Sequence, residues 1–146
     1  MMEAPASVSR DDVVAAARRW LGTPFHHQGR AKGVGVDCAG VLVEVARELG
    51  LGDVDIRGYG HRPDSRELER LCYFHMTRVR LLDAEPGDVL LIEVDGQPQH
   101  IAFLTRLEGE AALLHAYAPA RRVVEHRMDE EWGSRVVAAF RLPGIA

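Results

Sequence analysis

Five short apolar runs between residues 85 and 141 constrain the fold of this chain more than any other feature. The runs read EPGDVLLIEV, QHIAFLT, AALLHAY, RRVVEH and RVVAAFR, and each has the length and composition of a β-strand. The segments before them carry apolar residues at helical spacing instead. Because helices come first and strands second, the order favours an α+β domain, with the helices packed on an antiparallel sheet of about five strands.

Three helices are predicted ahead of the strands. The first follows Ser9, whose side chain can cap it, and stops before Gly22. The second begins at Cys38 and ends before Gly50, and the third follows Ser65. Their apolar stripes contain Val13, Ala17, Trp20 and Leu21 in the first, Val41, Leu42, Val45, Ala46 and Leu49 in the second, and Leu68, Leu71, Cys72 and Met76 in the third.

The chain is expected to form one domain over residues 1–146. With 146 residues and 47% hydrophobic content it can bury a real core, and it shows no repeat, low-complexity tract or linker. Residues 23–37 contain Pro24 and three glycines, which predicts a surface loop without regular structure.

Charge and the N-terminus argue against several classes of partner. The 18 basic and 22 acidic residues give a net charge of −4 and form no basic block, so nucleic acid is not an expected partner. The start, MMEAPASVSRDD, lacks the basic and apolar segments of a secretory signal, and no stretch is long enough to span a bilayer. We therefore expect cytoplasmic synthesis without a signal peptide, and no membrane partner.

The two cysteines, Cys38 and Cys72, differ in what their surroundings predict. They are too few for a disulfide framework and lack zinc-site spacing, so free thiols are expected, although pairing with each other stays open. Cys72 is accounted for by packing in a helix. Cys38 lies in the first turn of a helix, where unpaired N–H groups and the helix dipole favour the nucleophilic thiolate.

A catalytic cysteine also needs a histidine, and His100 and His115 lie on adjacent predicted strands. A hairpin loop of two or four residues would place both on one face of the sheet. This face, shared with Ala102 and Leu104, is where we expect the Cys38 helix to pack. His100 would then act as the base and His115 as the residue that orients it, with the Cys38 N–H facing a developing oxyanion.

These parts together fit acyl transfer through a thioester. Each residue also has an ordinary structural explanation, since a single strand histidine or buried cysteine is more often packing than catalysis.

An ordered series of motifs resembles the NlpC family of papain-like cysteine peptidases. WLGTPFHHQG at 20–29 is similar to the segment before the nucleophile, and DCAG at 37–40 to the Asp-Cys-Ser-Gly signature. PGDVLLIE at 86–93, QHIAFL at 99–104 and LLHAY at 113–117 resemble the strands that follow, over roughly residues 9–142. The resemblance implies a papain-like fold in which Cys38, His100 and His115 are nucleophile, base and orienting residue.

The resemblance also implies a substrate and a reaction. The expected reaction is hydrolysis of the γ-D-glutamyl bond to a diamino acid in peptidoglycan stem peptides, through an acyl-enzyme and without a cofactor. The short catalytic-only architecture resembles the phage tail or gene-transfer-particle branch. Other phage tail proteins are then expected partners, and a phage-like particle would deliver the protein to the cell wall.

Two positions depart from the family pattern and bear on substrate binding. Ala39 replaces the usual Ser and leaves the backbone donors intact. Phe25 stands where many members have Tyr, which puts the positioning of the acyl group by that hydroxyl in question. His26, His27 and Gln28 could compensate. With Phe25, Asp37 and Tyr59 they are the expected substrate-binding residues, and Arg62 and Asp64 could also rim the groove.

Other charged residues of the 23–37 loop leave alternatives open. Arg30 and Lys32 either bind the carboxylates of an acidic stem peptide or are solvated loop charges. The pair His26–His27 invites a metal site, but no HExxH motif, helical i,i+4 histidine pair or cysteine pair completes one, so no metal is expected.

Two other functions remain compatible with these residues. One is a structural or wall-binding phage tail component with weak or no catalysis. The other is a thiol acyltransferase or thioesterase that uses the same three residues on the same scaffold.

Overall fold

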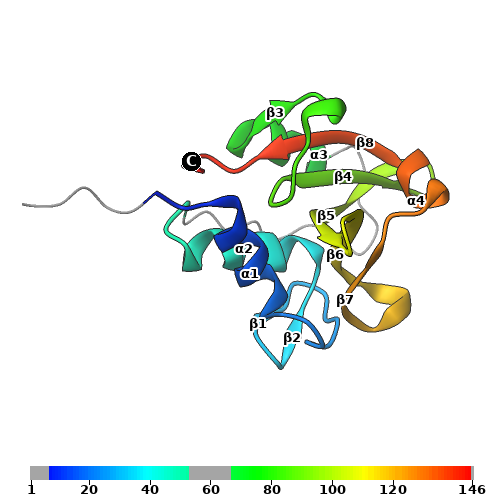
Figure 1. Ribbon diagram of the computed structural model, residues 1–146. Helices are drawn as coiled ribbons and strands as arrows, with labels where there is room; N and C mark the ends of the chain where they lie inside the picture. The colour runs from blue at the N-terminus through cyan, green and yellow to red at the C-terminus, as the bar shows by residue number, and fades with distance from the viewer. Residues whose placement is uncertain (1–6, 53–66, 146) are drawn as a thin grey trace, which may run out of the picture.

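The computed structural model describes residues 7–52 and 67–145, which form an antiparallel sheet with helices (Figure 1). The sheet order is β3-β8-β4-β5-β6-β7, and every neighbouring pair is antiparallel. Its strands are β3 (Thr77–Val79), β4 (Val89–Val94), β5 (Gln97–Leu107), β6 (Glu110–Tyr117), β7 (Arg122–Arg127) and β8 (Val136–Arg141). The helices are α1 (Arg10–Arg18), α2 (Cys38–Glu48), α3 (Glu67–His75) and α4 (Glu130–Ser134). The predicted α+β class is therefore confirmed.

Three strands were not expected from the sequence. The five predicted runs became β4 to β8, and β3 adds a sixth strand of three residues at the sheet edge. The 23–37 loop, expected to be irregular, contains a small hairpin of β1 (Arg30–Ala31) and β2 (Gly35–Val36). Strands this short have no alternating pattern long enough to detect.

The helix ends follow their capping residues. Ser9 caps α1 in a reciprocal capping box, because its side chain accepts from the Asp12 N–H and the Asp12 side chain accepts from the Ser9 N–H. Gly50, after α2, adopts a left-handed φ of 71°, as predicted. Ser65, Arg62, Asp64 and Tyr59 lie outside the described residues. None of the helices within residues 7–52 and 67–145 is both long and apolar enough to cross a membrane.

The two faces of the sheet bury different sets of side chains. Ile101 and Phe103 share a core cluster with the buried residues of α1 and α2, whereas Ala102 and Leu104 belong to a cluster on the opposite face. The prediction that α2 packs on the face of His100, Ala102 and Leu104 is therefore wrong. Alternation along a strand defines two faces but does not say which face the helices cover, and here they cover the larger side chains.

A bulge interrupts β5 directly before His100. Ile92 pairs with His100 and Glu93 pairs with Pro98, so Gln99 is an extra residue on β5. Such a bulge bends the strand and increases its local twist. The local twist of the sheet is therefore increased beside His100.

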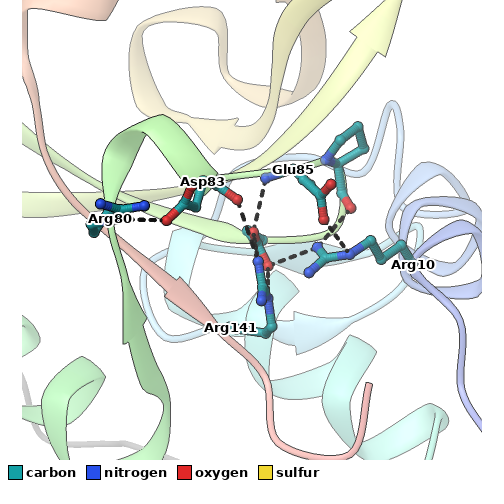
Figure 2. Close-up of polar contacts among 7 residues, drawn as sticks. Arg10, Arg80, Asp83, Glu85 and Arg141 are labelled. Atoms are coloured by element: carbon teal, nitrogen blue, oxygen red, sulfur yellow. Dashed lines mark hydrogen bonds and ion pairs between the residues drawn. The ribbon is translucent and has the colours of Figure 1, made fainter. Parts of the chain in front are cut away.

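A charged cluster joins the start of α1 to the beginning of β4 and the end of β8 (Figure 2). The Asp88 carboxylate is fully buried and accepts hydrogen bonds from Arg10 Nη1 at 2.9 Å and from Arg141 Nε and Nη2 at 3.0 Å. Its Oδ2 also accepts from the Glu85 N–H at 2.9 Å. Burial alone would raise the pKa of Asp88, but the bonds from Arg141, Glu85 and Arg10 outweigh it and hold that pKa below its usual value.

Candidate active site

Cys38 is the first residue of α2, and Asp37 immediately before it is the N-cap. Asp37 Oδ1 accepts from the Gly40 N–H at 2.9 Å and from Arg30 Nη1 at 3.0 Å, and Oδ2 accepts from the Gln28 N–H at 2.7 Å. One buried carboxylate therefore ties the 23–37 loop to the start of the helix that carries the thiol.

Gly40 allows that loop to approach the helix closely. A Cβ at this position would lie 2.5 Å from the Gly29 carbonyl oxygen and 2.6 Å from Val36 Cγ2. Both contacts are too short for a real side chain, and one of them is with backbone. The glycine of the DCAG motif is therefore required by packing, next to the residue that caps the helix.

Burial opposes ionisation of the Cys38 thiol. Burial, with the negative charge of Asp37 adding to it, raises the pKa of Cys38 to about 11, although the N–H groups of Ile101, Ala39 and Cys38 itself oppose the shift. The expectation that the helix N-terminus favours a resting thiolate is thus outweighed by burial. The Ile101 N–H lies close enough to the sulfur to lower the pKa of Cys38, and Ile101 directly follows His100 in the sequence.

His100 and His115 come together as the hairpin argument predicted. The loop between β5 and β6 has two residues, Glu108 and Gly109, with φ values of 51° and 81°. His100 Nε2 lies 2.6 Å from His115 Nδ1, and both side chains are buried. Burial lowers the pKa of His100 to about 4, and burial together with the neighbouring His100 and His126 rings lowers the pKa of His115. Both rings are therefore neutral at pH 7.

A third histidine, His126 on β7, extends this pair and was missed in the sequence. His126 Nε2 lies 2.8 Å from His115 Nε2, and its Nδ1 lies 2.9 Å from the Arg127 carbonyl oxygen. The signal was available, because the loop between β6 and β7 has four residues, 118–121. The parity argument used for the first hairpin also puts His126 and His115 on one face of the sheet.

Aromatic rings surround the three histidines. Tyr117 stacks on His115 with a centroid distance of 5.1 Å, and Trp132 of α4 meets His115 edge-on at 5.2 Å. Trp132 also lies 5.2 Å from His126. These contacts hold the ring planes in place.

A cavity of about 230 Å³ opens beside Cys38 and is also lined by His100. His100 follows the bulge at Gln99, and both residues line this cavity. The lining residues come from both halves of the chain: Phe25, His27, Asp37, Cys38, Ala39, Glu67, Leu68, Leu71, Val94, Gln99, His100, Ala116, Tyr117, Ala118, Pro119 and Arg135.

The other expected substrate-binding residues divide into two groups. Phe25, His27 and Asp37 line the cavity, although Asp37 is also committed to capping α2. His26 and Gln28 are not among the described residues that line it. Tyr59 lies outside the described residues.

Neither cation of the 23–37 loop lies in the cavity lining of the described chain. The Arg30 side chain is only 7% exposed and bonds Asp37, so it holds the loop and does not present a charge to a substrate. Lys32 Nζ lies 5.4 Å from the centroid of the Trp20 ring. The reading of these two residues as carboxylate ligands is therefore wrong for Arg30 and gains no support for Lys32. Within residues 7–52 and 67–145, no group of three or more His, Cys, Asp or Glu side chains is arranged to hold a metal ion.

The pH dependence of alkylation should report the resting state of Cys38. With a thiol pKa of about 11, the rate with iodoacetamide is expected to rise about tenfold per pH unit between pH 7 and 10. Cys72 is buried in a core cluster, its pKa is raised to about 12 by burial, and it should react only on unfolding. Mass spectrometry of the labelled peptides distinguishes the two, with Cys72→Ala as control. A rate that is constant from pH 6 to 9 would instead show a preformed thiolate–imidazolium pair.

No protein-family model and no curated protein matches this sequence. Solved structures do match it. The NlpC/p60 domain of the peptidoglycan hydrolase SagA is 24% identical with a TM-score of 0.63, over 92% of this chain and 100% of that one. An NlpC/p60 family protein from Bacillus cereus is 20% identical with a TM-score of 0.69, over 94% of this chain and 41% of that one. An N-acetylmuramoyl-L-alanine amidase from Bacteroides uniformis is 12% identical with a TM-score of 0.61, over 91% of this chain and 98% of that one.

These similarities show that the chain has the fold of NlpC/p60 domains. They confirm, at the level of the fold, the resemblance drawn from the ordered motifs. The match covers the whole of the solved SagA domain but less than half of the Bacillus cereus chain.

Proposed function

We propose that this protein is a cysteine peptidase that hydrolyses the γ-D-glutamyl bond to a diamino acid in peptidoglycan stem peptides. The observation that carries the proposal is a thiol at a helix N-terminus that shares one cavity with His100, which is itself hydrogen-bonded to His115. The similarity of the fold to a domain of a peptidoglycan hydrolase and to an N-acetylmuramoyl-L-alanine amidase supports a cell-wall amide as the substrate.

In the proposed reaction, Cys38 attacks the carbonyl carbon of the scissile amide. Because burial favours the neutral thiol and the neutral imidazole, the thiol proton passes to His100 Nδ1 as the sulfur–carbon bond forms. The backbone N–H of Cys38, at the first turn of α2, is suited to donate to the oxyanion. The C–N bond then breaks, and His100 returns the proton to the leaving amine.

Water completes the cycle by attacking the thioester. His100 takes a proton from the water and gives it to the departing sulfur, so that a free carboxylic acid and the Cys38 thiol are formed. Nucleophile and base are supplied by Cys38 and His100, so every proton in this cycle is accounted for by this chain and water.

Digestion of purified sacculi tests this function. Mass spectrometry should detect fragments with a new glutamyl carboxyl group and a new amine on the diamino acid. Turnover of acyl esters with intact sacculi would favour the acyltransferase or thioesterase alternative. Binding to sacculi without any turnover would favour a structural tail component. Delivery as part of a phage-like particle, with other tail proteins as partners, remains a prediction.

Arg135 is the cation best placed to bind a substrate carboxylate. It is the one Arg or Lys among the described residues that line the cavity. Its guanidinium lies over the Trp132 ring at 5.2 Å and is paired with Glu131, so its plane is held in place while the side chain stays 37% exposed. Stem peptides of the proposed kind carry free carboxylates, which a guanidinium binds well.

Arg135→Gln should therefore weaken substrate binding with little effect on the chemical step. We expect KM for a stem-peptide fragment to rise about tenfold while kcat changes little. The matched control is Arg106→Gln, an exposed arginine of β5 outside the cavity lining. An unchanged KM in Arg135→Gln would remove this residue from substrate recognition.

A further inference from the structure

The three histidines form one continuous chain of hydrogen bonds that ends on a main-chain carbonyl. The chain runs from His100 Nε2 to His115 Nδ1 at 2.6 Å, from His115 Nε2 to His126 Nε2 at 2.8 Å, and from His126 Nδ1 to the Arg127 oxygen at 2.9 Å. Both nitrogens of His115 and both nitrogens of His126 are used. Only His100 keeps a nitrogen outside the chain, and its ring lines the cavity next to Cys38.

When each ring carries one proton, the carbonyl end determines the direction of every bond in this chain. A carbonyl oxygen can only accept, so His126 Nδ1 carries the proton and donates it to the Arg127 oxygen. The other nitrogen of a neutral imidazole is an acceptor, so His126 Nε2 accepts from His115 Nε2–H.

The same rule, applied to His115 and then to His100, gives the tautomer of the proposed base. His115 Nδ1 is then the acceptor, and it receives the His100 Nε2–H. His100 Nδ1 is therefore left with a free lone pair, the state needed to take a proton from the Cys38 thiol.

Without an acceptor at His126, His115 could place its proton on Nδ1 instead. It would then donate to His100 Nε2, and the proton of a neutral His100 would move to Nδ1, where it blocks the base. The rings of Tyr117 and Trp132 hold the plane of His115, but such ring contacts do not favour one tautomer over the other.

We propose that His126 is a positioning residue that selects the competent tautomers of His115 and His100. The proposal rests on the proposed function for its effect on rate, but the tautomers themselves belong to the resting protein. After the thiol proton arrives, the His100 imidazolium donates to His115 Nδ1. The acceptor at His126 strengthens that bond by polarising the His115 ring.

The matched variants are His126→Phe and His126→Gln. Phenylalanine keeps a ring beside Trp132 and removes the acceptor, whereas the glutamine Oε1 can accept near the position of Nε2. His75→Phe, a half-buried histidine of α3 outside the cavity with Cys38, controls for the loss of any imidazole. Thermal melts establish that each variant is folded before it is compared.

Nitrogen-15 NMR of histidine-labelled full-length protein reads the tautomers directly. In the wild type, His100 and His115 should both carry the proton on Nε2. His126→Phe should shift both rings toward the Nδ1–H form and lower kcat on a stem-peptide fragment by about 10- to 100-fold, with KM nearly unchanged. His126→Gln should recover part of both effects, and His75→Phe should show neither.

Two results would overturn the proposal: wild-type tautomers in folded His126→Phe, or wild-type kcat in that variant. Failure of the proposed function is a separate result, because it appears as a wild-type protein without activity on sacculi. The tautomer measurement still decides the role of His126 in that case. A purely structural role would change the melting temperature but leave the tautomers of the folded variant as they are.

Discussion

Replacing Cys38 with alanine is expected to reduce stem-peptide cleavage by on the order of 10⁴-fold or more, because no covalent intermediate can then form. The fold should be retained. Asp37 keeps its bond to the Gly40 N–H, and alanine at the first helical position disturbs neither the cap nor the core. The measurement is release of soluble fragments from sacculi, followed by chromatography and mass spectrometry.

The controls for this prediction separate nucleophilic catalysis from loss of structure. Cys72→Ala removes the other thiol, which lies in the core cluster and is absent from the described lining of the catalytic cavity, and it should cleave at nearly the wild-type rate. Because Cys38 and His100 act as a unit, the double variant Cys38→Ala/His100→Ala should be no slower than Cys38→Ala alone. A Cys38→Ala protein that cleaves as well as Cys72→Ala would refute the cysteine mechanism.

Asp88→Ala is expected to lower the free energy of unfolding by about 3 kcal/mol and the melting temperature by about 10 °C. The carboxylate is fully buried and accepts four hydrogen bonds, from Arg10, from two nitrogens of Arg141 and from the Glu85 N–H (Figure 2). Its removal takes the carboxylate acceptor from all four donors and loosens α1 and β8 from the start of β4, although Arg10 Nη1 keeps the Pro86 carbonyl as an acceptor. Both guanidinium groups are partly exposed, so water recovers part of the loss. Urea unfolding measures the difference.

The control is Asp83→Ala in the same cluster. Asp83 is exposed and pairs with Arg80 at 2.7 Å, and exposed pairs of this kind contribute about 0.2–1 kcal/mol. Equal unfolding midpoints for Asp83→Ala and Asp88→Ala would mean that the buried network adds nothing beyond a surface pair.

The stability of the protein at acid pH provides an independent measure of the contribution of Asp88. Its pKa is lower in the folded protein than the usual 3.8. The resulting stabilisation is therefore complete above about pH 3.8 and is lost as the pH falls through the folded value. The difference in stability between the wild type and Asp88→Ala should accordingly narrow below pH 3.8.

Local patterns accounted for most of the elements. Ser9 and Gly50 mark helix ends because capping and left-handed glycine depend on a few consecutive residues. The contact between His100 and His115 also depends on local sequence, since the two-residue loop at Glu108 and Gly109 sets the register of the whole hairpin. The sequence does not predict β3, because three residues are too few to show an alternation of apolar and polar side chains.

The errors concern contacts between distant segments. Arg30 was read as a free cation, but the loop folds back so that it bonds the Asp37 carboxylate. The helix face was misassigned because alternation gives Ile101 and His100 opposite sides without saying which side the helices take. The helix N-terminus favours the Cys38 thiolate, whereas burial raises the pKa of this thiol, and no local sequence pattern records burial.

The order of the elements, the helix that starts at Cys38 and the pairing of two histidines were determined by the amino-acid sequence itself, since each depends on neighbours within a turn or a hairpin. The tertiary structure decided which sheet face meets α2, how His126 and the Arg127 carbonyl complete the histidine chain, and how burial raises the pKa of the Cys38 thiol. These properties depend on burial and on bonds between segments that only the packed chain brings together.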